Sequence, residues 1–288
     1  MTGRPPDRFR GQGAVVTGAS KGIGRAIAQE LGRVGFRLLL VARPGPALER
    51  TTNELADAGV EAHPIGLDLA DPGAAERVRA AAESAFRGPP YALVNNAGIA
   101  VAGRFERLPA EALDRMVAVD LVAPIRLSRA FLPDLLAAGR GHLVHLSSGA
   151  ADFPPPGLAL YATMKSALRS FSVALDLEYR RRGIRSTSIE PTYVRTDLGR
   201  RPGDAEAPLE ALARRHPRWV LEPRTVARAV ERALRSPRAR VPVPAIWGPI
   251  STAGRIAWPI ARHLLEVPGP GDRPGLGGLR PLAPGKDD

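Results

Sequence analysis

Three side chains near the middle of the chain have the types and the spacing of a proton-transfer device. Tyr161 and Lys165 are four residues apart, so they would share one face of a helix, and Ser148 stands thirteen residues before the tyrosine. A tyrosine hydroxyl can donate or accept a proton, a nearby ammonium group lowers its pKa, and a serine hydroxyl can hold a substrate oxygen. A tyrosine–lysine pair on an amphipathic surface is the simpler interpretation, and the spacing alone would favour it. The catalytic interpretation therefore needs a second motif.

A glycine-rich turn near the start of the chain is that second motif. Residues 17–24 read TGASKGIG and join an expected strand to an expected helix. Glycines let the backbone approach a pyrophosphate, which then meets the helix N-terminus and its partial positive charge. An ordinary βα turn is the alternative, but the strand–turn–helix context is the one that a dinucleotide-binding loop requires. The sequence thus combines a proton-transfer group with a site for a hydride-carrying nucleotide.

The apolar pattern predicts the fold that would position these motifs. Continuous apolar runs such as residues 38–41 are typical of strands that helices cover on both faces. Asp71 would cap the third helix, with Pro72 at its first position, and Pro124 is the expected point of any interruption in the fourth. We expect strands over residues 13–17, 37–42, 61–67, 91–95, 141–146 and 184–189, and helices over residues 23–31, 46–58, 71–86, 109–138 and 158–182. This alternation predicts an α/β fold, a Rossmann-type doubly wound parallel sheet in a three-layer αβα arrangement.

The regular pattern weakens after Pro191. Helices are expected over residues 204–216 and 223–235, and two prolines make residues 241–244 an edge strand at best. We predict one Rossmann-fold oxidoreductase domain over residues 1–245, an apolar extension over residues 246–267 and a disordered Pro/Gly-rich tail over residues 268–288. The extension could cover a substrate pocket, contact a second subunit or lie on a membrane surface, although its prolines argue against the last.

The composition restricts compartment and partners. The 288 residues include no cysteine, which excludes disulfides, thiol chemistry and Cys-based metal sites, and no metal is expected. The polar N-terminus and the absence of an apolar run of roughly eighteen residues favour the cytoplasm. The net charge of +12 would suit nucleic acid, but the arginines are scattered and aromatic residues make up only 5%. We therefore expect a solvated basic surface and no dedicated nucleic-acid site.

In combination, the motifs resemble those of the short-chain dehydrogenase/reductase family. The resemblance covers about residues 12–236 and includes the glycine loop, the NNAG segment at residues 95–98, Ser148, and the YATMK segment at residues 161–165, in the family's order. It implies an NAD(P)-dependent oxidoreductase. Tyr161 would be the general acid in carbonyl reduction and the general base in alcohol oxidation. Lys165 would bind the nicotinamide ribose and lower the pKa of the tyrosine, and Ser148 would hold the substrate oxygen.

The resemblance also implies a set of cofactor contacts. Asp68 would meet the adenine, although it could instead cap a neighbouring turn. Residues 191–196 match the family's PGxVxT segment except for Thr192 in place of glycine, and Val194 and Thr196 would hold the carboxamide. The residues expected at the cofactor are Gly18, Ser20, Lys21, Gly22, Ile23, Gly24, Arg43, Asp68, Leu69, Asn95, Ala97, Gly98, Tyr161, Lys165, Pro191, Val194 and Thr196.

The end of the second expected strand indicates which nucleotide binds. Sites that prefer NAD carry an acid there, whereas this chain reads Val41-Ala42-Arg43. A guanidinium suits a 2′-phosphate, and Lys21 would add a second cation. Arg43 could be one more surface arginine, but the missing acid favours NADP(H), with NAD(H) as the alternative.

Asp120 is the main departure from the family pattern. Most active relatives carry asparagine there, and it helps to hold a water that connects the lysine to bulk solvent. An ionised Asp120 near Lys165 would favour the ammonium form and oppose the tyrosinate. The outcome is a tuned enzyme or, in the extreme, an inactive one. We expect a tuned enzyme, with Asp120 in the catalytic group, because the other catalytic residues are intact.

The candidate walls of a substrate pocket are Phe153, Pro154, Pro155, Pro156, Tyr193, Trp219 and Trp247. They suggest a hydrophobic ketone, aldehyde or alcohol as the small-molecule substrate. A 3-oxoacyl-type reductase for acyl-carrier-linked substrates is an alternative that the positive charge would suit. A regulatory nucleotide-binding protein with weakened catalysis is another, motivated by Asp120 and Thr192. By analogy with the family we expect a homodimer or homotetramer, formed by apolar stretches around Leu127, Phe131 and Leu135 and on the next long helix.

Overall fold

The computed structural model describes residues 9–198 and 220–256. The expected helix over residues 204–216, Trp219 and the tail over residues 268–288 lie outside the described residues, as does the end of the apolar extension.

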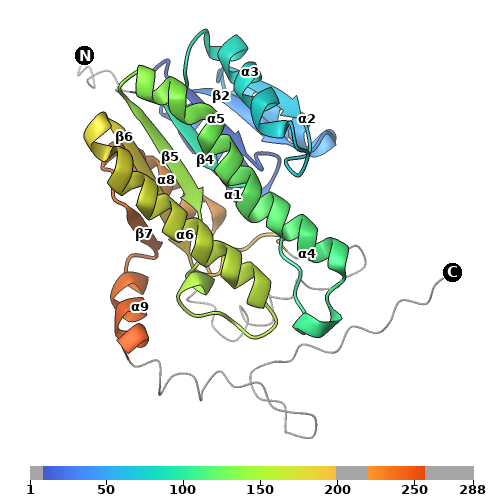
Figure 1. Cartoon of the computed structure of the whole chain (residues 1–288). Helices are drawn as coiled ribbons and strands as arrows, with labels where there is room; N and C mark the ends of the chain where they lie inside the picture. Colours follow the sequence, from blue (N-terminus) through green and yellow to red (C-terminus); the bar gives the residue numbers. More distant parts are fainter. Residues whose placement is uncertain (1–8, 199–219, 257–288) are drawn as a thin grey trace, which may run out of the picture.

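A parallel sheet of seven strands forms the centre of the described part of the chain (Figure 1). Its strands run in the order β3-β2-β1-β4-β5-β6-β7, so the order reverses between β1 and β4. The strands are β1 (Gly13–Thr17), β2 (Arg37–Ala42), β3 (Ala62–Gly66), β4 (Ala92–Asn95), β5 (Gly141–Leu146), β6 (Ile184–Pro191) and β7 (Arg240–Val243). The doubly wound sheet is confirmed, and β7 is the edge strand that its prolines predict.

Two helical layers cover the sheet. The helices α1 (Gly22–Arg33), α2 (Pro46–Asp57) and α8 (Pro223–Arg235) pack on one face, and α3 (Ala74–Phe86), α5 (Ala123–Ala137) and α6 (Ala159–Tyr179) pack on the other. Neighbouring residues of one strand enter opposite cores: Leu38 and Leu40 join Ile27, whereas Leu39 joins Phe131. The continuous apolar run therefore marks a strand buried on both faces, and the three-layer αβα arrangement is confirmed.

The start of α3 differs from the expectation. The helix begins at Ala74, and no side chain caps it, so the prediction of Asp71 as N-cap and Pro72 as first residue is wrong. The preceding residues form a turn in which the carbonyl of Asp71 accepts from the Ala74 N–H. Asp68 stabilises the same turn by accepting from the Ala70 N–H at 3.0 Å. Because Asp68 and Asp71 bind these backbone N–H groups locally, α3 begins about one turn later than expected.

The long helix expected over residues 109–138 changes its winding close to Pro124. It consists of α4 (Ala110–Val117), a π-helical turn η2 (Ala118–Val122) and α5. Proline has no N–H to donate to the carbonyl of Asp120 four residues earlier, so the chain widens there. The expected interruption is confirmed, and it places Asp120 at an irregular turn.

Short elements complete the description. These are the 3-10 turns η1 (Phe105–Arg107), η3 (Gly149–Ala151) and η4 (Arg180–Arg182), and α9 (Trp247–Ile256), which follows β7. The expected subunit contact through Leu127, Phe131 and Leu135 is not available, because all three side chains are buried against the sheet. The large apolar side chains of α5 and α6 that are exposed are Ile125 and Leu177.

Candidate active site

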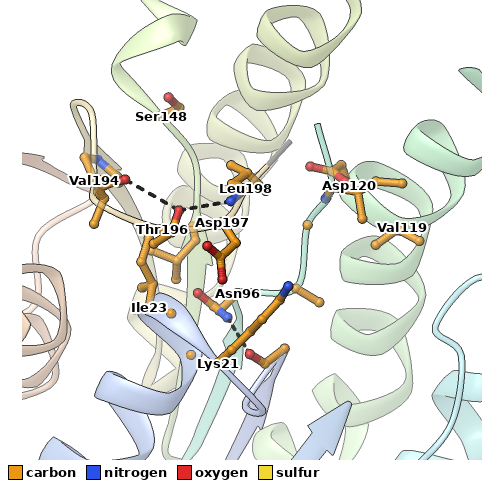
Figure 2. A pocket seen from close by; sticks show the side chains of 18 of the residues that line it. Lys21, Ile23, Asn96, Val119, Asp120, Ser148, Val194, Thr196, Asp197 and Leu198 are labelled. Carbon is orange, nitrogen blue, oxygen red and sulfur yellow. Dashed lines mark hydrogen bonds between the residues drawn. The ribbon is translucent and has the colours of Figure 1, made fainter. Parts of the chain in front are cut away.

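A cavity of 1370 Å³ opens at the carboxyl ends of the central strands (Figure 2). This is the edge at which open α/β sheets bind ligands, close to the point where the strand order reverses. The cavity is lined by the glycine loop, by the segments that follow β2, β3, β4 and β5, by α6, and by residues 191–198. The motifs that were read separately along the sequence therefore meet at one site.

The glycine loop is packed so closely that side chains would not fit. Gly18 has a φ of +66°, and a Cβ there would lie 2.9 Å from the Cα of Ala97. A Cβ on Gly24 would lie 2.1 Å from the carbonyl oxygen of Gly18. The loop backbone and the start of α1 thus form a cradle without side chains, which suits the close approach of a pyrophosphate.

The NNAG segment holds the glycine loop in place. The side chain of Asn96 donates to the Thr17 carbonyl at 2.8 Å, and the N–H groups of Asn96 and Ala97 donate to the Thr17 hydroxyl at 2.9 and 3.0 Å. Asn96 lines the cavity, although the sequence interpretation did not select it. Its position next to Asn95 in the NNAG segment was the signal that could have identified it.

Asn95 is the predicted cofactor residue that does not line the cavity. Its side chain is buried behind β4, where the amide lies 3.3 Å from His145 Nδ1 and 3.4 Å from the Ser128 hydroxyl. Burial lowers the pKa of His145 to about 3, so this imidazole is neutral. The predicted residues that do line the cavity are Gly18, Ser20, Lys21, Gly22, Ile23, Gly24, Arg43, Asp68, Leu69, Ala97, Gly98, Tyr161, Lys165, Pro191, Val194 and Thr196.

Tyr161, Lys165 and Ser148 meet on one side of the cavity. The Lys165 Nζ lies 5.5 Å from the centre of the Tyr161 ring and donates to the Leu146 carbonyl at 3.1 Å. Ser148 follows β5, and its hydroxyl accepts from the Ala150 N–H at 3.2 Å. Both side chains of α6 are nearly buried, with 8% of Tyr161 and 4% of Lys165 exposed. The tyrosine and the lysine are thus largely buried although they line the cavity.

Asp120 forms a buried ion pair with Lys165. Its Oδ2 lies 3.1 Å from Nζ, and its Oδ1 accepts from the Ile99 N–H at 2.8 Å. The aspartate side chain is completely buried. The fourth position of the catalytic group thus holds a carboxylate in direct contact with the lysine.

The protonation of this group differs from the simple expectation. Burial raises the pKa of Tyr161, and the charge of Asp120 raises it as well. The charge of Lys165 and a hydrogen bond with Ser148 lower this pKa, but the net effect is a raised pKa. The expected lowering of the tyrosine pKa by Lys165 is therefore outweighed in this structure. Burial lowers the pKa of Lys165, but Asp120 and Tyr161 together raise it by more than burial lowers it. The amine is therefore held as ammonium.

The other end of the cavity carries cations. Arg43 and Lys21 are exposed at its wall, and neither forms an ion pair with another described residue. Arg115 of α4, which the sequence interpretation missed, lines the same end and binds the Asp68 carboxylate at 2.5 Å. The Ala70 N–H lowers the pKa of Asp68, burial opposes it, and Arg115 lowers it further, so this acid is ionised. Asp68 thus caps the neighbouring turn, which was the alternative role considered for it, and it also lines the cavity.

The substrate end of the cavity is mostly apolar. Phe153, Pro155, Tyr193 and Trp247 line it, whereas Pro154 and Pro156 are exposed outside it. The Phe153 and Trp247 rings meet edge to face with centres 5.5 Å apart. The sequence interpretation missed the further apolar lining residues Ile99, Leu158 and Leu198. Figure 2 shows Leu198 with Thr196 and Val194, where local hydrogen bonds join the Thr196 hydroxyl to the Val194 carbonyl and to the Leu198 N–H.

Two structural features are absent from the described residues. No group of three or more His, Cys, Asp or Glu side chains is arranged to hold a metal ion. No described helix has both the length and the apolar character needed to cross a membrane.

Comparisons with known proteins agree with this arrangement. The family model for short chain dehydrogenases matches residues 12–207. Probable oxidoreductase EphD of Mycobacterium tuberculosis (strain ATCC 25618 / H37Rv) is 40% identical over 201 residues, which are 69% of this chain and 33% of EphD. The chain thus matches about one third of that relative's length.

Two solved structures extend the similarity to the fold. A metagenomic short-chain oxidoreductase in complex with NADP is 32% identical, with a TM-score of 0.68 over 81% of this chain and 96% of that one. A short chain dehydrogenase/reductase from Burkholderia phymatum in complex with NAD is 25% identical, with a TM-score of 0.75 over 91% of this chain and 98% of that one.

Proposed function

The chain belongs to the short-chain dehydrogenase/reductase family, and on that premise we propose that it is an NADP(H)-dependent enzyme that interconverts a hydrophobic ketone or aldehyde and the corresponding alcohol. One observation carries the proposal: Ser148, Tyr161 and Lys165 line the same cavity as the glycine loop. Proton-transfer groups and a nucleotide cradle are thus within reach of one bound substrate.

The residues of this chain would divide the chemistry among them. When bound, the nicotinamide cofactor supplies or accepts the hydride. Ser148 would donate a hydrogen bond to the substrate oxygen, and Tyr161 would give its phenolic proton to that oxygen in reduction or remove it in oxidation. Lys165 would hold the nicotinamide ribose and stabilise the tyrosinate. Because its pKa is raised, Tyr161 carries its proton at neutral pH, which favours its role as the acid in carbonyl reduction.

The preference for NADP(H) rests on the cations at the nucleotide end. Arg43 and Lys21 are exposed on the cavity wall, and although the charge of Arg43 also acts on the Asp68 carboxylate, both cations can reach a 2′-phosphate. No acid stands at the end of β2 to bind a ribose hydroxyl. Solved relatives with NADP and with NAD both exist, so this chain's own residues must support the choice.

The preference for a hydrophobic substrate rests on the lining beyond Tyr161. Phe153, Leu158 and Trp247 offer ring and aliphatic surface, and the hydroxyls of Ser148 and Tyr161 offer the polar contacts for one oxygen. Acyl-carrier-linked 3-oxo substrates stay a second candidate, which the net charge of +12 supports. A regulatory protein with weakened turnover is the candidate from another class, and Asp120 supports it.

A substrate screen followed by NADPH oxidation tests the proposal. We expect turnover of hydrophobic ketones or aldehydes, reduced about 10²-fold to 10⁴-fold in Tyr161→Phe because the proton donor is lost. The variant keeps the ring, so the dissociation constant of NADPH serves as the control and should stay within about two-fold. Tight NADPH binding without Tyr161-dependent turnover of any carbonyl would instead favour the regulatory protein.

A further inference from the structure

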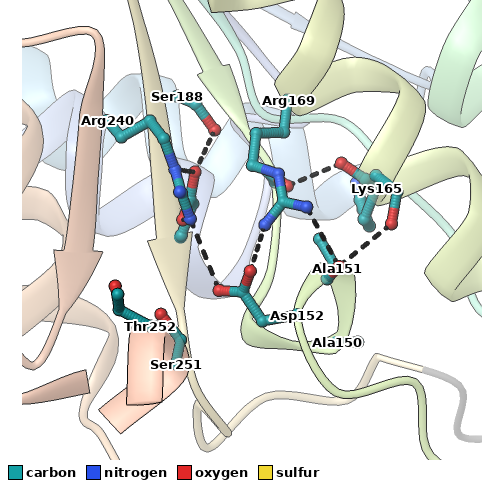
Figure 3. A network of polar contacts seen from close by, with 12 residues as sticks. Ala150, Ala151, Asp152, Lys165, Arg169, Ser188, Arg240, Ser251 and Thr252 are labelled. Carbon is teal, nitrogen blue, oxygen red and sulfur yellow. Dashed lines mark hydrogen bonds and ion pairs between the residues drawn. The ribbon is translucent and has the colours of Figure 1, made fainter. Parts of the chain in front are cut away.

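The segment that carries Ser148 is fastened to the fold by a network of buried charges that the proposed chemistry does not use (Figure 3). Asp152 follows η3, four residues after Ser148, and its side chain is completely buried. Its Oδ1 accepts from Arg169 at 2.5 Å, and its Oδ2 accepts from Arg240 at 3.4 Å. Two arginines from distant elements therefore converge on one carboxylate.

The Arg169 side of the network joins this segment to the catalytic helix. Arg169 lies one turn after Lys165 on α6, and it also donates to the Ala151 carbonyl at 3.1 Å. Ser166 donates to the same carbonyl at 3.2 Å. On the other side of Ser148, the Ser147 hydroxyl donates to the Lys165 carbonyl at 2.7 Å. Ser148 is thus bracketed by contacts with the turn of α6 that carries the lysine.

The Arg240 side joins the segment to the end of β6. Arg240 donates from Nε and Nη2 to the two carboxylate oxygens of Glu190 at 2.9 and 2.7 Å. Glu190 is completely buried and also accepts from the Ser188 hydroxyl at 3.0 Å. It precedes Pro191, where the chain enters the cavity wall. One arginine of the edge strand thus connects both segments that close the active site.

The network pairs two carboxylates with two guanidinium groups, so its charges balance. Asp152 and Glu190 have no exposed side-chain surface, and 17% of Arg169 and 36% of Arg240 is exposed. Removing the Asp152 carboxylate would leave the Arg169 guanidinium without its carboxylate partner beside a buried turn, whereas Arg240 would keep Glu190, and the turn would lose its anchor on α6. Phe153, the next residue, forms part of the substrate wall with Trp247. Movement of Asp152 would therefore displace the substrate wall and Ser148 together.

We propose that Asp152 is a positioning residue, which through Arg169 and Arg240 fixes Ser148 and Phe153 relative to Tyr161. This inference rests on the proposed function, because it assigns to the network the geometry of carbonyl binding. A misplacement of about 1 Å at reacting groups can reduce the rate about 10²-fold. The network acts at the substrate end of the cavity, so the nucleotide end should be little affected.

The test compares Asp152→Asn with a matched control, a second buried aspartate that lies on α6. Asp176 of α6 is also buried, is held by Arg185 at 2.8 and 3.2 Å, and accepts from the Ser186 N–H at 3.0 Å. Neither aspartate lines the cavity, but these hydrogen bonds of Asp176 go to β6 and not to the segment that carries Ser148. Both Asn variants should lower the Tm. Asp152→Asn alone should raise the KM for the carbonyl and lower kcat/KM about ten-fold or more, with the dissociation constant of NADPH changed by less than about two-fold.

Hydrogen exchange of the peptide over residues 147–157 separates this inference from the proposed function. Asp152→Asn should exchange faster there than the wild type and Asp176→Asn. If the wild type turns over and Asp152→Asn matches Asp176→Asn in kcat/KM, the inference is overturned. If the wild type turns over nothing, the proposed function fails, and the exchange decides alone: faster exchange supports anchoring by Asp152, and unchanged exchange overturns it.

Discussion

The ion pair between Asp120 and Lys165 makes the proton supply of Tyr161 unusual at the level of single residues. The carboxylate lies 3.1 Å from Nζ, and its charge raises the pKa of both Lys165 and Tyr161. An asparagine at this position would lack that charge. Asp120 therefore raises the pH at which Tyr161 ionises and keeps the tyrosine in its acid form over a wider range of pH.

Asp120→Asn tests this electrostatic role. Removing the negative charge should lower the pKa of Tyr161, because the contribution of Asp120 is upward. A general acid is active below its pKa, so the alkaline limb of the kcat/KM profile for carbonyl reduction should move to lower pH. The measurement is that profile with NADPH in both proteins.

A second carboxylate serves as the control for this profile. Asp134 of α5 is paired with Arg79 at 2.6 and 2.9 Å, outside the cavity, so Asp134→Asn should leave the alkaline limb in place. An alkaline limb that stays unchanged in Asp120→Asn would mean that Asp120 does not tune the tyrosine.

Replacing Arg43 gives a second prediction, which concerns the choice between NADPH and NADH. Charge-assisted hydrogen bonds are worth about 1.5–3 kcal/mol each, so Arg43→Ala should weaken NADPH binding about 10-fold to 100-fold. NADH lacks the 2′-phosphate, and its dissociation constant should change by less than about two-fold. Titration of both nucleotides measures the difference. Arg50→Ala, which removes an exposed arginine of α2 outside the cavity, should change neither value. Tighter binding of NADH than of NADPH to the wild type would contradict the assignment.

At the scale of elements, the sequence predicted what depends on local pattern. The strands β1, β2 and β5 and the helix α8 have the expected bounds, because apolar runs and periodicity determine them. The start of α3 was missed, since the side chain of Asp68 competes for the backbone groups of the preceding turn. The interruption before Pro124 was predictable from the missing N–H, but its π-helical form was not.

The candidate site was predictable to the extent that its residues lie in contiguous motifs. The glycine loop, Ser148 and the tyrosine–lysine pair are such motifs, and the cavity contains all of them. The partners of Asp68 and Asp152 were not predictable, because Arg115 and Arg240 are 47 and 88 residues away in sequence. A basic composition offers many arginines, and only the fold selects which of them meets a buried acid.

At the scale of the whole molecule, the excess of positive charge makes the ionised carboxylates important for stability. The net charge is +12 at neutral pH, and each carboxylate that takes up a proton adds to the self-repulsion of the folded chain. Several of these acids join elements that are distant in sequence, such as Asp134 between α5 and α3 and Glu190 between β6 and β7.

Asp176 allows this expectation to be tested. Burial raises its pKa, but Arg185 and the Ser186 N–H lower it more, so the folded-state pKa lies below the ordinary value of 3.8. Its contribution to stability is thus complete above that value and is lost as the pH falls below it. Asp176→Asn should reduce the free energy of unfolding at pH 7 by about 2 kcal/mol. In urea titrations at several pH values, the difference from the wild type should shrink below pH 3.8, and a constant difference would show that the ionised carboxylate contributes nothing.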